Sequence, residues 1–437
     1  MMERYDEYKD SGIEWIGEIP AGWEVAPMKT IWSESKEIVD SGDPEQLLSV
    51  SEYYGVDYRK TRIGSDEILM RADSLKGYKA CRSSDLVMNI MLAWKGAQGV
   101  SPYDGLVSPA YAVFTSIGNN YTPYAHYLYR TPLYCSAFKR NSTGIIDSRL
   151  RLYPDVFLRM PCIIPAFEEQ KRIVEYLDAK TSQIDELIAD QEKSIELLEE
   201  YRKAVISEAV TKGLDPNAPM KDSGIDWIGE IPKEWGQSKM KYLCRITSGS
   251  TPSKSVLSFW QGSIPWVSSK EVKQAEIWDT EHHITKEAIE SCSTELYPEG
   301  TYVTVVRSGI LKHTIPIARI MKPMAVNQDI KAMAFDDQSI ADWVALFFTG
   351  LNDALLAALT NEGSTVDNLN TRAFENCPII IPPKEIRESI TLLLHMKMNK
   401  IDALIADKRQ LIDKLKEYRK SLIFEAVTGK FKVPGVA

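Results

Sequence analysis

Cysteine is scarce in this sequence, and the few cysteines are not clustered. The 437 residues include six cysteines, and no two of them have the C-x-x-C spacing typical of zinc sites and redox motifs. The one close pair of other candidate ligands is His282 and His283, whose adjacent side chains point apart. We therefore expect neither a disulfide framework nor a bound metal ion.

Long apolar runs are also missing. The most apolar stretch, residues 344–359, is interrupted by Gly350, Asn352 and Asp353, so it is too short and too polar to span a bilayer. The N-terminus is acidic and has no apolar core, which argues against a signal peptide. These absences predict a cytoplasmic protein without a membrane partner.

An excess of positive charge is absent as well. The chain has 52 Lys and Arg residues against 61 Asp and Glu residues, a formal net charge of -9. Because basic surface drives generic nucleic-acid binding, this balance alone argues against a nucleic-acid coat protein. The apolar share of 44% and the charged share of 26% are typical of globular proteins. The length predicts two to four domains.

Recognisable catalytic motifs are missing too. The sequence contains no G-x-x-x-x-G-K-[ST] phosphate loop, no G-x-G-x-x-G after a strand and no Asn-Pro-Pro-Tyr motif for amino-methylation. Glu271 and Lys273 have the E-x-K spacing of some nucleases, but a three-residue match is weak. His126 lies among tyrosines and is better explained by packing. We expect a chain without catalytic residues of its own.

The sequence does contain a long internal repeat. Residues 9–20 return as residues 221–232 with eleven of twelve identities and an offset of 212, and a tryptophan follows each copy at Trp23 and Trp235. A second pair of matching segments, residues 184–190 and 401–407, has an offset of 217. The chain is therefore a tandem duplication.

The segments between these repeats differ from each other. Residues 24–160 and 236–376 share little obvious sequence. A repeat protein of uniform units would diverge evenly along its length, whereas here a constant frame encloses two variable segments. This pattern is typical of a scaffold that presents two different recognition modules.

Two long helices are predicted at the ends of the repeats. Neither proline nor glycine occurs in residues 168–212 or 384–428, and Gly213 and Gly429 then supply C-terminal stops. Each run of 45 residues would form a helix of roughly 65 Å at 1.5 Å per residue. Each run also follows a proline-bounded apolar segment, which we predict to be a strand.

The apolar residues of both runs fit a heptad repeat, and polar residues interrupt it at matching places, Gln191 with Lys408 and Arg202 with Arg419. The alternative is a single amphipathic helix packed on its own domain, against which the length argues. The predicted coiled-coil seam consists of Leu177, Ile184, Ile188, Ile195 and Leu198 in the first run and Leu394, Ile401, Ile405, Ile412 and Leu415 in the second.

Charge favours pairing of these two helices with each other. Residues 161–213 carry a net charge of -5 and residues 377–437 a net charge of +5, so a mixed pair is favoured over either self-pair. Because the two halves are duplicates, a pseudo-twofold axis is the natural arrangement, and it makes the pair antiparallel.

Polar clusters in the variable segments are suited to nucleic acid. Arginine can pair with guanine, asparagine and glutamine with adenine, and serine and threonine hydroxyls with phosphates. The alternative for each cluster alone is an ordinary solvated loop. The candidates are Arg59, Lys60, Arg62, Lys139, Arg140, Ser142, Arg149 and Arg151 in the first segment, and Ser248, Thr251, Ser253, Lys254, Arg307, Ser308, Lys312, Asn327 and Gln328 in the second.

The combined features resemble the DNA-specificity subunit of type I restriction–modification systems over essentially the whole chain. The resemblance rests on the duplicated frame, the Trp-Ile-Gly-Glu-Ile-Pro repeat, Pro-Ile-Ile-Ile-Pro-Pro at 378–383, Ser-Gly-Ser-Thr-Pro at 248–252 and Ile-Pro-Trp-Val at 264–267. It implies two target-recognition domains, each reading one half of a bipartite asymmetric site in double-stranded DNA. The helices would set the spacer between the half-sites.

The resemblance also implies partners. It implies assembly with two methyltransferase subunits and two restriction subunits, which would bind S-adenosylmethionine, ATP and Mg²⁺, with no cofactor in this chain. Docking is expected around residues 168–176 and 385–393. The first helix begins with Phe-Glu-Glu-Gln at 167–170 whereas the second has Lys-Glu-Ile-Arg at 384–387, so the two docking ends are expected to differ.

The predicted fold is therefore mixed α/β (α+β), with two globular recognition domains joined by two long antiparallel coiled-coil helices. Two other functions remain as alternatives: the recognition portion of a fused methyltransferase–endonuclease, and a coiled-coil scaffold that binds only protein. The predicted boundaries are a leader at 1–23, recognition domains at 24–165 and 236–383, a central helix at 166–213, a repeated leader at 214–235 and a C-terminal helix at 384–437.

Overall fold

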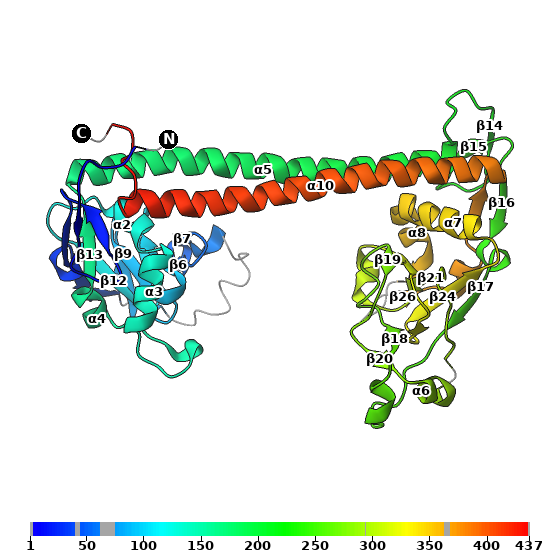
Figure 1. Cartoon of the computed structure of the whole chain (residues 1–437), viewed down its shortest axis with the longest axis horizontal. Helices are drawn as coiled ribbons and strands as arrows, with labels where there is room; N and C mark the ends of the chain where they lie inside the picture. The colour runs from blue at the N-terminus through cyan, green and yellow to red at the C-terminus, as the bar shows by residue number, and fades with distance from the viewer. Residues whose placement is uncertain (1–2, 40–43, 62–74, 293, 362–367, 436–437) are drawn as a thin grey trace. The chain divides into compact units, whose positions relative to one another are not determined.

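The computed structural model describes residues 3–39, 44–61, 75–292, 294–361 and 368–435 (Figure 1). The chain forms two compact units, one made of residues 1–191 and 410–437 and the other of residues 192–409. Each unit contains one variable segment, one copy of the repeated leader and part of each long helix. The two units therefore do not coincide with the predicted segments of the sequence, because each long helix contributes residues to both units.

The repeated leader folds into the same hairpin in both units. Lys9 pairs with Ile19 in the first copy, and Lys221 pairs with Ile231 in the second. The turn between the strands is closed by the same bond, from the amide of a serine to the carbonyl of a glycine six residues later. The strands are β1 (Tyr8–Asp10) and β2 (Glu18–Pro20) in the first unit and β14 (Met220–Asp222) and β15 (Glu230–Pro232) in the second.

The variable segment of the first unit is a mixed domain around antiparallel sheets. Its four-stranded sheet has the order β10-β9-β12-β4, and all four residues of β9 are buried, as expected for an interior strand covered on both faces. The strands of this sheet are β4 (Trp32–Ser35), β9 (Leu86–Asn89), β10 (Gln98–Val100) and β12 (Tyr111–Ser116).

A three-stranded sheet, β11-β8-β5, and a two-stranded ribbon, β6-β7, complete the strands of this domain. They consist of β5 (Ile38–Val39), β6 (Leu48–Ser51), β7 (Gly55–Tyr58), β8 (Tyr78–Cys81) and β11 (Gly105–Val107). Three helices follow in the sequence: α2 (Thr122–Leu128), α3 (Pro132–Asn141) and α4 (Pro154–Arg159).

The variable segment of the second unit is also mixed, with a larger sheet of order β17-β24-β21-β22-β19 and a smaller one of order β20-β18-β23. The larger sheet contains β17 (Cys244–Ser248), β19 (Glu276–Ile277), β21 (Tyr302–Val305), β22 (Ile317–Ile320) and β24 (Ile330–Phe335). The smaller one contains β18 (Ile264–Val267), β20 (His283–Ile284) and β23 (Ala325–Val326), and β25 (Thr360–Asn361) pairs separately with β26 (Asn368–Leu369).

The helices of the second domain include the most apolar stretch of the sequence. Among the described residues no single helix is long and apolar enough to cross a membrane; α7 and α8 pass this test only together, and they are bent by 86°. Trp343, Phe347 and Phe348 of α7 are buried in the core of the unit. The helices are α6 (Lys286–Ser291), α7 (Gln338–Gly350), α8 (Asn352–Leu359) and α9 (Thr371–Glu375).

Both proline-bounded apolar segments form strands that pair with the residues just after the leader. In the first unit Cys162 lies opposite Ala26, and in the second Ile379 lies opposite Ser238. This pairing closes each variable domain at its base, where its first and last strands meet. The pairs are β3 (Glu24–Pro27) with β13 (Pro161–Ile164), and β16 (Gly236–Lys239) with β27 (Pro378–Ile381).

The long helices are α5 (Phe167–Lys212) and α10 (Lys384–Val427), with bounds within one residue of the predicted runs. Gly213 and Gly429 both have positive φ, 79° and 71°, as expected for helix-ending glycines. A Cβ atom on Gly429 would lie 2.5 Å from Pro20, and one on Gly213 would lie 3.1 Å from Trp235. Both glycines are therefore favoured by their left-handed backbone conformation. Gly429 is needed in addition because its backbone lies close to Pro20 of the leader.

The two helices pair antiparallel, as predicted. In the second unit Arg202 contacts Asp402 at 2.9 Å and Glu199 contacts Arg409 at 3.4 Å, so residue numbers rise along one helix as they fall along the other. In the first unit Arg419 contacts Asp185 at 3.0 Å. The Arg419 pair repeats the Arg202 pair after the offset of 217 in both residues, as a pseudo-twofold duplication requires.

The seam between the helices is apolar at the predicted positions. All of the predicted seam residues except Ile412 join the hydrophobic cores formed by the variable domains and the leaders. Leu177, Ile184, Leu394, Ile401, Ile405 and Ile412 are buried, and Ile188, Ile195, Leu198 and Leu415 are half-buried.

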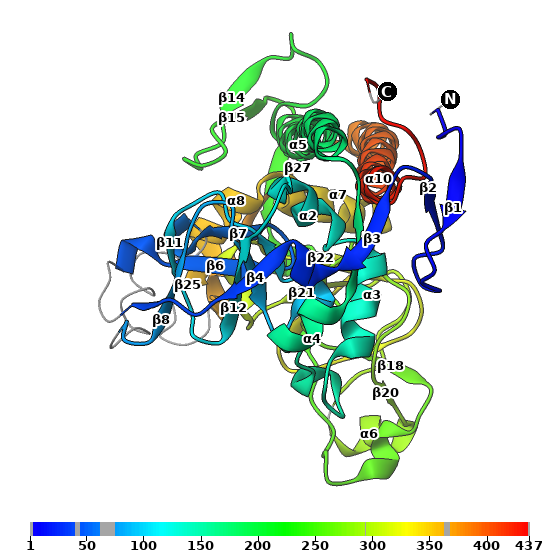
Figure 2. The ribbon, with the colours of Figure 1, turned by 90° about the vertical axis from the view of Figure 1, so that its left-hand side faces the viewer.

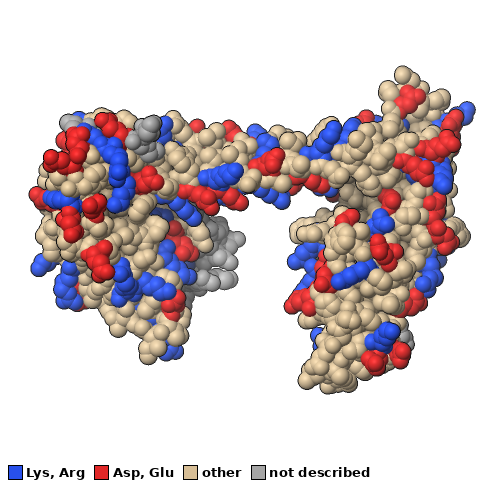
Figure 3. Space-filling view, in the orientation of Figure 1, with Lys and Arg blue, Asp and Glu red and all other residues tan. Residues whose placement is uncertain are grey.

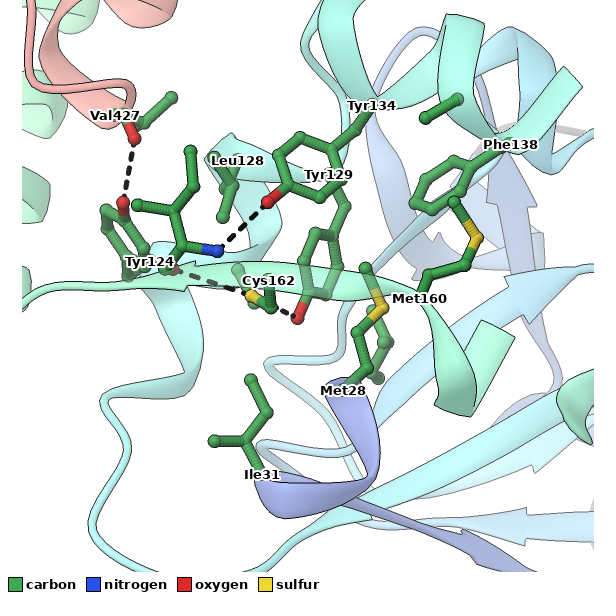
Figure 4. Close-up of a cluster of buried hydrophobic side chains, with 14 of the residues drawn as sticks. Met28, Ile31, Tyr124, Leu128, Tyr129, Tyr134, Phe138, Met160, Cys162 and Val427 are labelled. Carbon is green, nitrogen blue, oxygen red and sulfur yellow. Dashed lines mark hydrogen bonds between the residues drawn. The ribbon is translucent and has the colours of Figure 1, made fainter. Parts of the chain in front are cut away.

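A cluster of buried aromatic side chains attaches the end of α10 to the first unit (Figure 4). Tyr124 donates to the carbonyl of Val427 at 2.7 Å, and the hydroxyl of Tyr134 accepts from the amide of Ile163 at 3.0 Å. The hydroxyl of Tyr129 lies 3.3 Å from the sulfur of Cys162, and burial raises the pKa of this thiol to about 12. The thiol is therefore a neutral packing group rather than a reactive one.

Candidate nucleic-acid interface

The first group of candidate residues lies on the loop between α3 and α4. Lys139 and Arg140 are exposed in the last turn of α3, and Ser142 caps its end. Arg149 ends the 3-10 turn Asp147–Arg149, and Arg151 forms an isolated β-bridge with Thr143. The side chain of Ser142 donates to the carbonyl of Phe138 at 2.7 Å, so its hydroxyl hydrogen is used within the helix end. The structure therefore gathers five candidates on one short loop.

Lys139 is the most constrained cation of this loop. Its ammonium group lies 2.9 Å from the carboxylate of Asp147 and 4.6 Å from the centre of the Trp94 ring. Lys95 approaches the same ring at 5.2 Å. Two lysines thus contact one aromatic ring, an arrangement stabilised by cation–π attraction.

Arg59 and Lys60 belong to a different element. They lie on a single 3-10 turn, Arg59–Thr61, directly after β7, and Lys60 contacts Glu45 at 3.3 Å. No contact between this turn and the α3–α4 loop is found within the described part of the chain. Arg62 lies outside the described residues.

In the second unit the candidates come from three segments. Thr251, on the loop after β17, donates to the side-chain oxygen of Gln328 in the turn between β23 and β24 at 2.5 Å. A Cβ atom on Gly249 would overlap the carbonyl of Val326, so only glycine allows this loop to approach the turn. The glycine of the Ser-Gly-Ser-Thr-Pro motif is therefore required for the Thr251–Gln328 contact.

Most of the other candidates of the second unit are exposed. Ser253 and Lys254 are exposed on the same loop as Thr251, and Ser248 is exposed at the end of β17, just before this loop. Lys312 is exposed at the end of the 3-10 turn Gly309–Lys312, and Arg307 is exposed just before Ser308, the N-cap of this turn.

Asn327 differs from the other candidates because it is buried. Its amide donates to the carbonyl of Val267 at 3.0 Å, and its side-chain oxygen accepts from the amide of Asp329 at 2.9 Å. The exposed fraction of the residue is 6%. Its position therefore fits a turn-forming role, whereas the adjacent Gln328 is exposed.

The weak nuclease-like pair is not arranged as a catalytic site. One carboxylate oxygen of Glu271 accepts from both the amide and the hydroxyl of Ser268, at 2.8 and 2.6 Å, and so closes a local turn. Among the described residues no three His, Cys, Asp or Glu side chains lie close enough to hold a metal ion.

The surface charges are mixed. On the face shown in Figure 3, Lys and Arg side chains alternate with Asp and Glu side chains over both units. The candidate residues therefore form local clusters within a surface that has no large area of one sign there.

The comparisons with known proteins agree on one family. Residues 232–416 match the family model described as the type I restriction modification DNA specificity domain. The specificity subunit of the Escherichia coli type I restriction enzyme EcoR124I/EcoR124II is 28% identical over 261 residues, 58% of this chain and 59% of that protein. The chain is therefore similar to the specificity subunits of type I restriction–modification systems, and the match to the family model lies in its second half.

Other similar proteins are also specificity subunits of type I restriction enzymes, and the match covers part of their length. The specificity subunit of the type I restriction enzyme MjaVIII of Methanocaldococcus jannaschii is 25% identical over 64% of each chain. The specificity subunit of the MjaIX enzyme of the same organism is 28% identical over 42% of this chain and 41% of that protein. The matches thus span less than two thirds of these relatives.

Two solved structures have the same fold. A chain from a study of complex assembly in a type I restriction–modification system superposes with a TM-score of 0.67 at 16% identity, over 94% of this chain and 98% of that chain. The HsdS subunit from Thermoanaerobacter tengcongensis superposes with a TM-score of 0.53 at 15% identity, over the same shares. The predicted fold class is confirmed.

The difference that the sequence shows between the two helix starts has a structural role. Gln170 and Arg387 are buried, with exposed fractions of 0% and 4%. Gln170 donates to the carbonyl of Pro165 at 2.8 Å, and Arg387 donates to that of Pro382 at 3.4 Å, in equivalent positions of the repeat. These two side chains hold the strand-to-helix connection of each unit and are not available for docking.

The α3–α4 loop also has an apolar feature that the polar candidates predicted from the sequence do not include. Ile145 and Ile146, at its tip, have exposed fractions of 100% and 52%. The local sequence contains a usable signal: two adjacent β-branched apolar residues stand between Gly144 and Asp147, in a stretch otherwise typical of a polar turn.

Proposed function

We propose that this chain is the sequence-reading subunit of a type I restriction–modification complex. Each variable domain would read one half of a bipartite asymmetric site in double-stranded DNA. The observation that carries the proposal is the duplication itself: one constant frame of leader, closing strand and long helix encloses two domains of different sequence and different sheet order. A protein that reads one asymmetric site in two parts needs this combination.

The proposed subunit has no catalytic residues of its own. Methyl transfer and cleavage would be carried out by two methyltransferase subunits and two restriction subunits, which would hold S-adenosylmethionine, ATP and Mg²⁺. The near-balance of charge in the two variable segments supports this division, because a reader without excess cations leaves much of the phosphate neutralisation to its partners. Such a complex would act on DNA in the cytoplasm.

We place methyltransferase docking at the starts of the two long helices, which differ in chemistry. The exposed side chains at the start of α5 are charged, among them Glu168, Lys171 and Arg172. At the start of α10 they include Ile386 and Leu392, with exposed fractions of 38% and 64%. The two ends would therefore bind equivalent partners with different strength, the first being the more sensitive to salt.

A pocket beside the start of α10 supports this difference. It is lined by residues of the repeated leader and of the helix, including Trp235, Ile386 and Ile390. In the first unit Glu169 is the duplicate of Ile386, and it accepts hydrogen bonds from the Tyr5 hydroxyl at 2.6 Å and the Trp23 indole at 2.9 Å. The equivalent region of the first unit is thus filled by the N-terminal segment of the chain itself.

The test is to express the chain with its cognate methyltransferase subunit and to map methylated adenines in the host genome by long-read sequencing. We expect a two-part motif with a fixed gap. Replacing residues 236–376 by the corresponding segment of another family member should change one half of the motif and leave the other unchanged. Methylation without a bipartite motif, or none at all, would instead favour the protein-only scaffold.

A further inference from the structure

The tip of the α3–α4 loop exposes two adjacent apolar side chains. Ile145 is fully exposed and Ile146 is exposed by 52%. Single exposed apolar residues are normal on protein surfaces, whereas contiguous exposed apolar groups mark contact sites. Two adjacent isoleucines on one loop tip are therefore suited to contact a ligand that offers apolar groups.

The loop holds this pair in a defined conformation. At its base Thr143 and Arg151 exchange two backbone hydrogen bonds, of 2.9 and 3.0 Å, and within it the amide of Arg149 donates to the carbonyl of Ile146 at 2.8 Å. Gly144 has a φ of 152°, and a Cβ atom there would lie 2.6 Å from the carbonyl oxygen of Arg149. The isoleucines are thus held on a closed turn.

Four cations flank the apolar tip along the chain. Lys139, Arg140, Arg149 and Arg151 all belong to the loop or to the helix turn that leads into it, and the one carboxylate between them, Asp147, is paired with Lys139 at 2.9 Å. A polyanion fits this surrounding better than an apolar protein surface does. Double-stranded DNA combines a charged backbone with apolar groups, since each thymine presents a C5-methyl group in the major groove.

We propose that Ile145 and Ile146 are specificity-determining residues that contact thymine C5-methyl groups in the half-site read by the first domain, while the flanking cations hold the adjacent phosphates. This inference rests on the proposed function. It adds an apolar means of base recognition to the polar candidates.

The experiment uses the assembled complex of this chain with its methyltransferase subunits. Once the wild-type motif is mapped, equilibrium binding is measured on duplexes in which single thymines are replaced by uracil, which removes only the methyl group. In one half-site we expect at least one replacement to weaken wild-type binding by about three- to tenfold, the effect of losing one buried methyl contact. The same replacement should have no effect on the I145A/I146A variant.

Two further variants serve as controls. I117A removes an isoleucine of the same domain that is 40% exposed and lies outside the loop, and it should retain the full dependence on the thymine methyl. I145V/I146V keeps a β-branched apolar pair and should retain part of the dependence. Replacements in the other half-site should affect all variants equally.

The outcomes separate this inference from the proposed function. A wild-type complex without sequence-selective binding would contradict the proposed function. A selective complex whose thymine dependence survives in I145A/I146A would overturn the inference alone. So would a variant that loses the same affinity for every DNA sequence, because the isoleucines would then act without reading bases.

Discussion

Gln170 and Arg387 occupy the same position in the two copies of the repeat, yet their side chains differ in length and charge. Each also reaches the start of an earlier helix of its own domain. The Gln170 side-chain oxygen accepts from the amide of Tyr121, the N-cap of α2, at 3.0 Å. Arg387 donates to Asp337, the N-cap of α7, at 3.2 Å and to Ser339 at 2.7 Å. Two different residues thus make equivalent links between elements.

Replacing Arg387 by alanine should destabilise the second unit by about 1.5–3 kcal/mol, because hydrogen bonds to a charged group are lost and Asp337 loses its cation. Arg387→Gln should recover part of this loss, since glutamine makes the corresponding contact in the first unit. The midpoint of urea unfolding measures both effects. Lys384→Ala, which removes an exposed lysine of the same helix turn, is the matched control and should cost less than 0.5 kcal/mol.

His126 is a second position whose environment is set by close backbone contacts. A Cβ atom on Gly55 or Gly99 would lie 2.7 or 3.0 Å from the His126 ring, so the two glycine backbones pack directly against the imidazole. Burial, and after it the nearby Arg130, lowers the pKa of His126 from 6.5 to about 3. The imidazole is therefore neutral in the folded protein at any pH above that value.

The unfolded chain binds a proton at this histidine below pH 6.5, whereas the folded chain does so only near pH 3. The free energy of unfolding should therefore fall as the pH is lowered through this window, by about 2 kcal/mol between pH 7 and pH 5 from this group. His126→Gln should reduce that slope, measured as the free energy of unfolding in urea at several pH values. Equal slopes in the wild-type protein and the variant would show that His126 is not the group responsible.

At the scale of elements, the antiparallel helix pair combines two kinds of contact. The apolar seam is continuous with the cores of the variable domains, whereas the ion pairs Arg202–Asp402 and Arg419–Asp185 are largely exposed. Exposed ion pairs contribute little to stability because water and salt screen them. The seam therefore supplies the stability of the pairing, and the charges select the partner helix and its direction.

Ile401→Ala should cost about 2–5 kcal/mol of unfolding free energy, the usual effect of truncating a buried isoleucine. Arg202→Ala should cost about 1 kcal/mol or less, and its effect should shrink at high salt. Denaturant unfolding at low and high ionic strength compares the two variants. A larger loss for Arg202→Ala than for Ile401→Ala would contradict this division of roles.

At the scale of the whole molecule, each compact unit is assembled from distant parts of the chain. The N-terminal strand of the first unit lies beside the C-terminal segment, as Figure 2 shows, and Tyr8 donates to the carbonyl of Gly429 at 3.0 Å. Phe431 packs edge-on against Tyr176 with ring centres 6.0 Å apart. Both ends of the chain are thus part of the first unit, and the duplicated frame closes around both domains.

If the helices set the spacer of the recognised site, inserting two heptads into both should lengthen it. Matched insertions after Gln191 and after Arg409 keep the heptad register at the boundary of the two units. Fourteen residues add about 21 Å of helix, so the spacer should grow by up to about six base pairs while the half-sites stay the same. The same insertion after Asp215, outside the helices, is the control, and long-read methylation mapping measures the result. Altered half-sites would contradict the proposal that the helices set the spacer.

The features that depend on local pattern can be predicted from the amino-acid sequence alone. The duplication, the two long helices to within one residue at each end, their seam and their antiparallel pairing all follow from repeats, heptad spacing and charge. These signals lie within short windows, where hydrophobic periodicity and the absence of proline and glycine decide the backbone conformation.

Tertiary structure alone decided the features that join distant residues. The sheet orders, the burial of Asn327, the paired roles of Gln170 and Arg387 and the exposure of Ile145 depend on contacts that no local pattern encodes. Tyr124 and Val427, for example, meet across 303 residues of sequence. The same side chain can be a core residue or an exposed contact, and only the packing of other segments around it determines which.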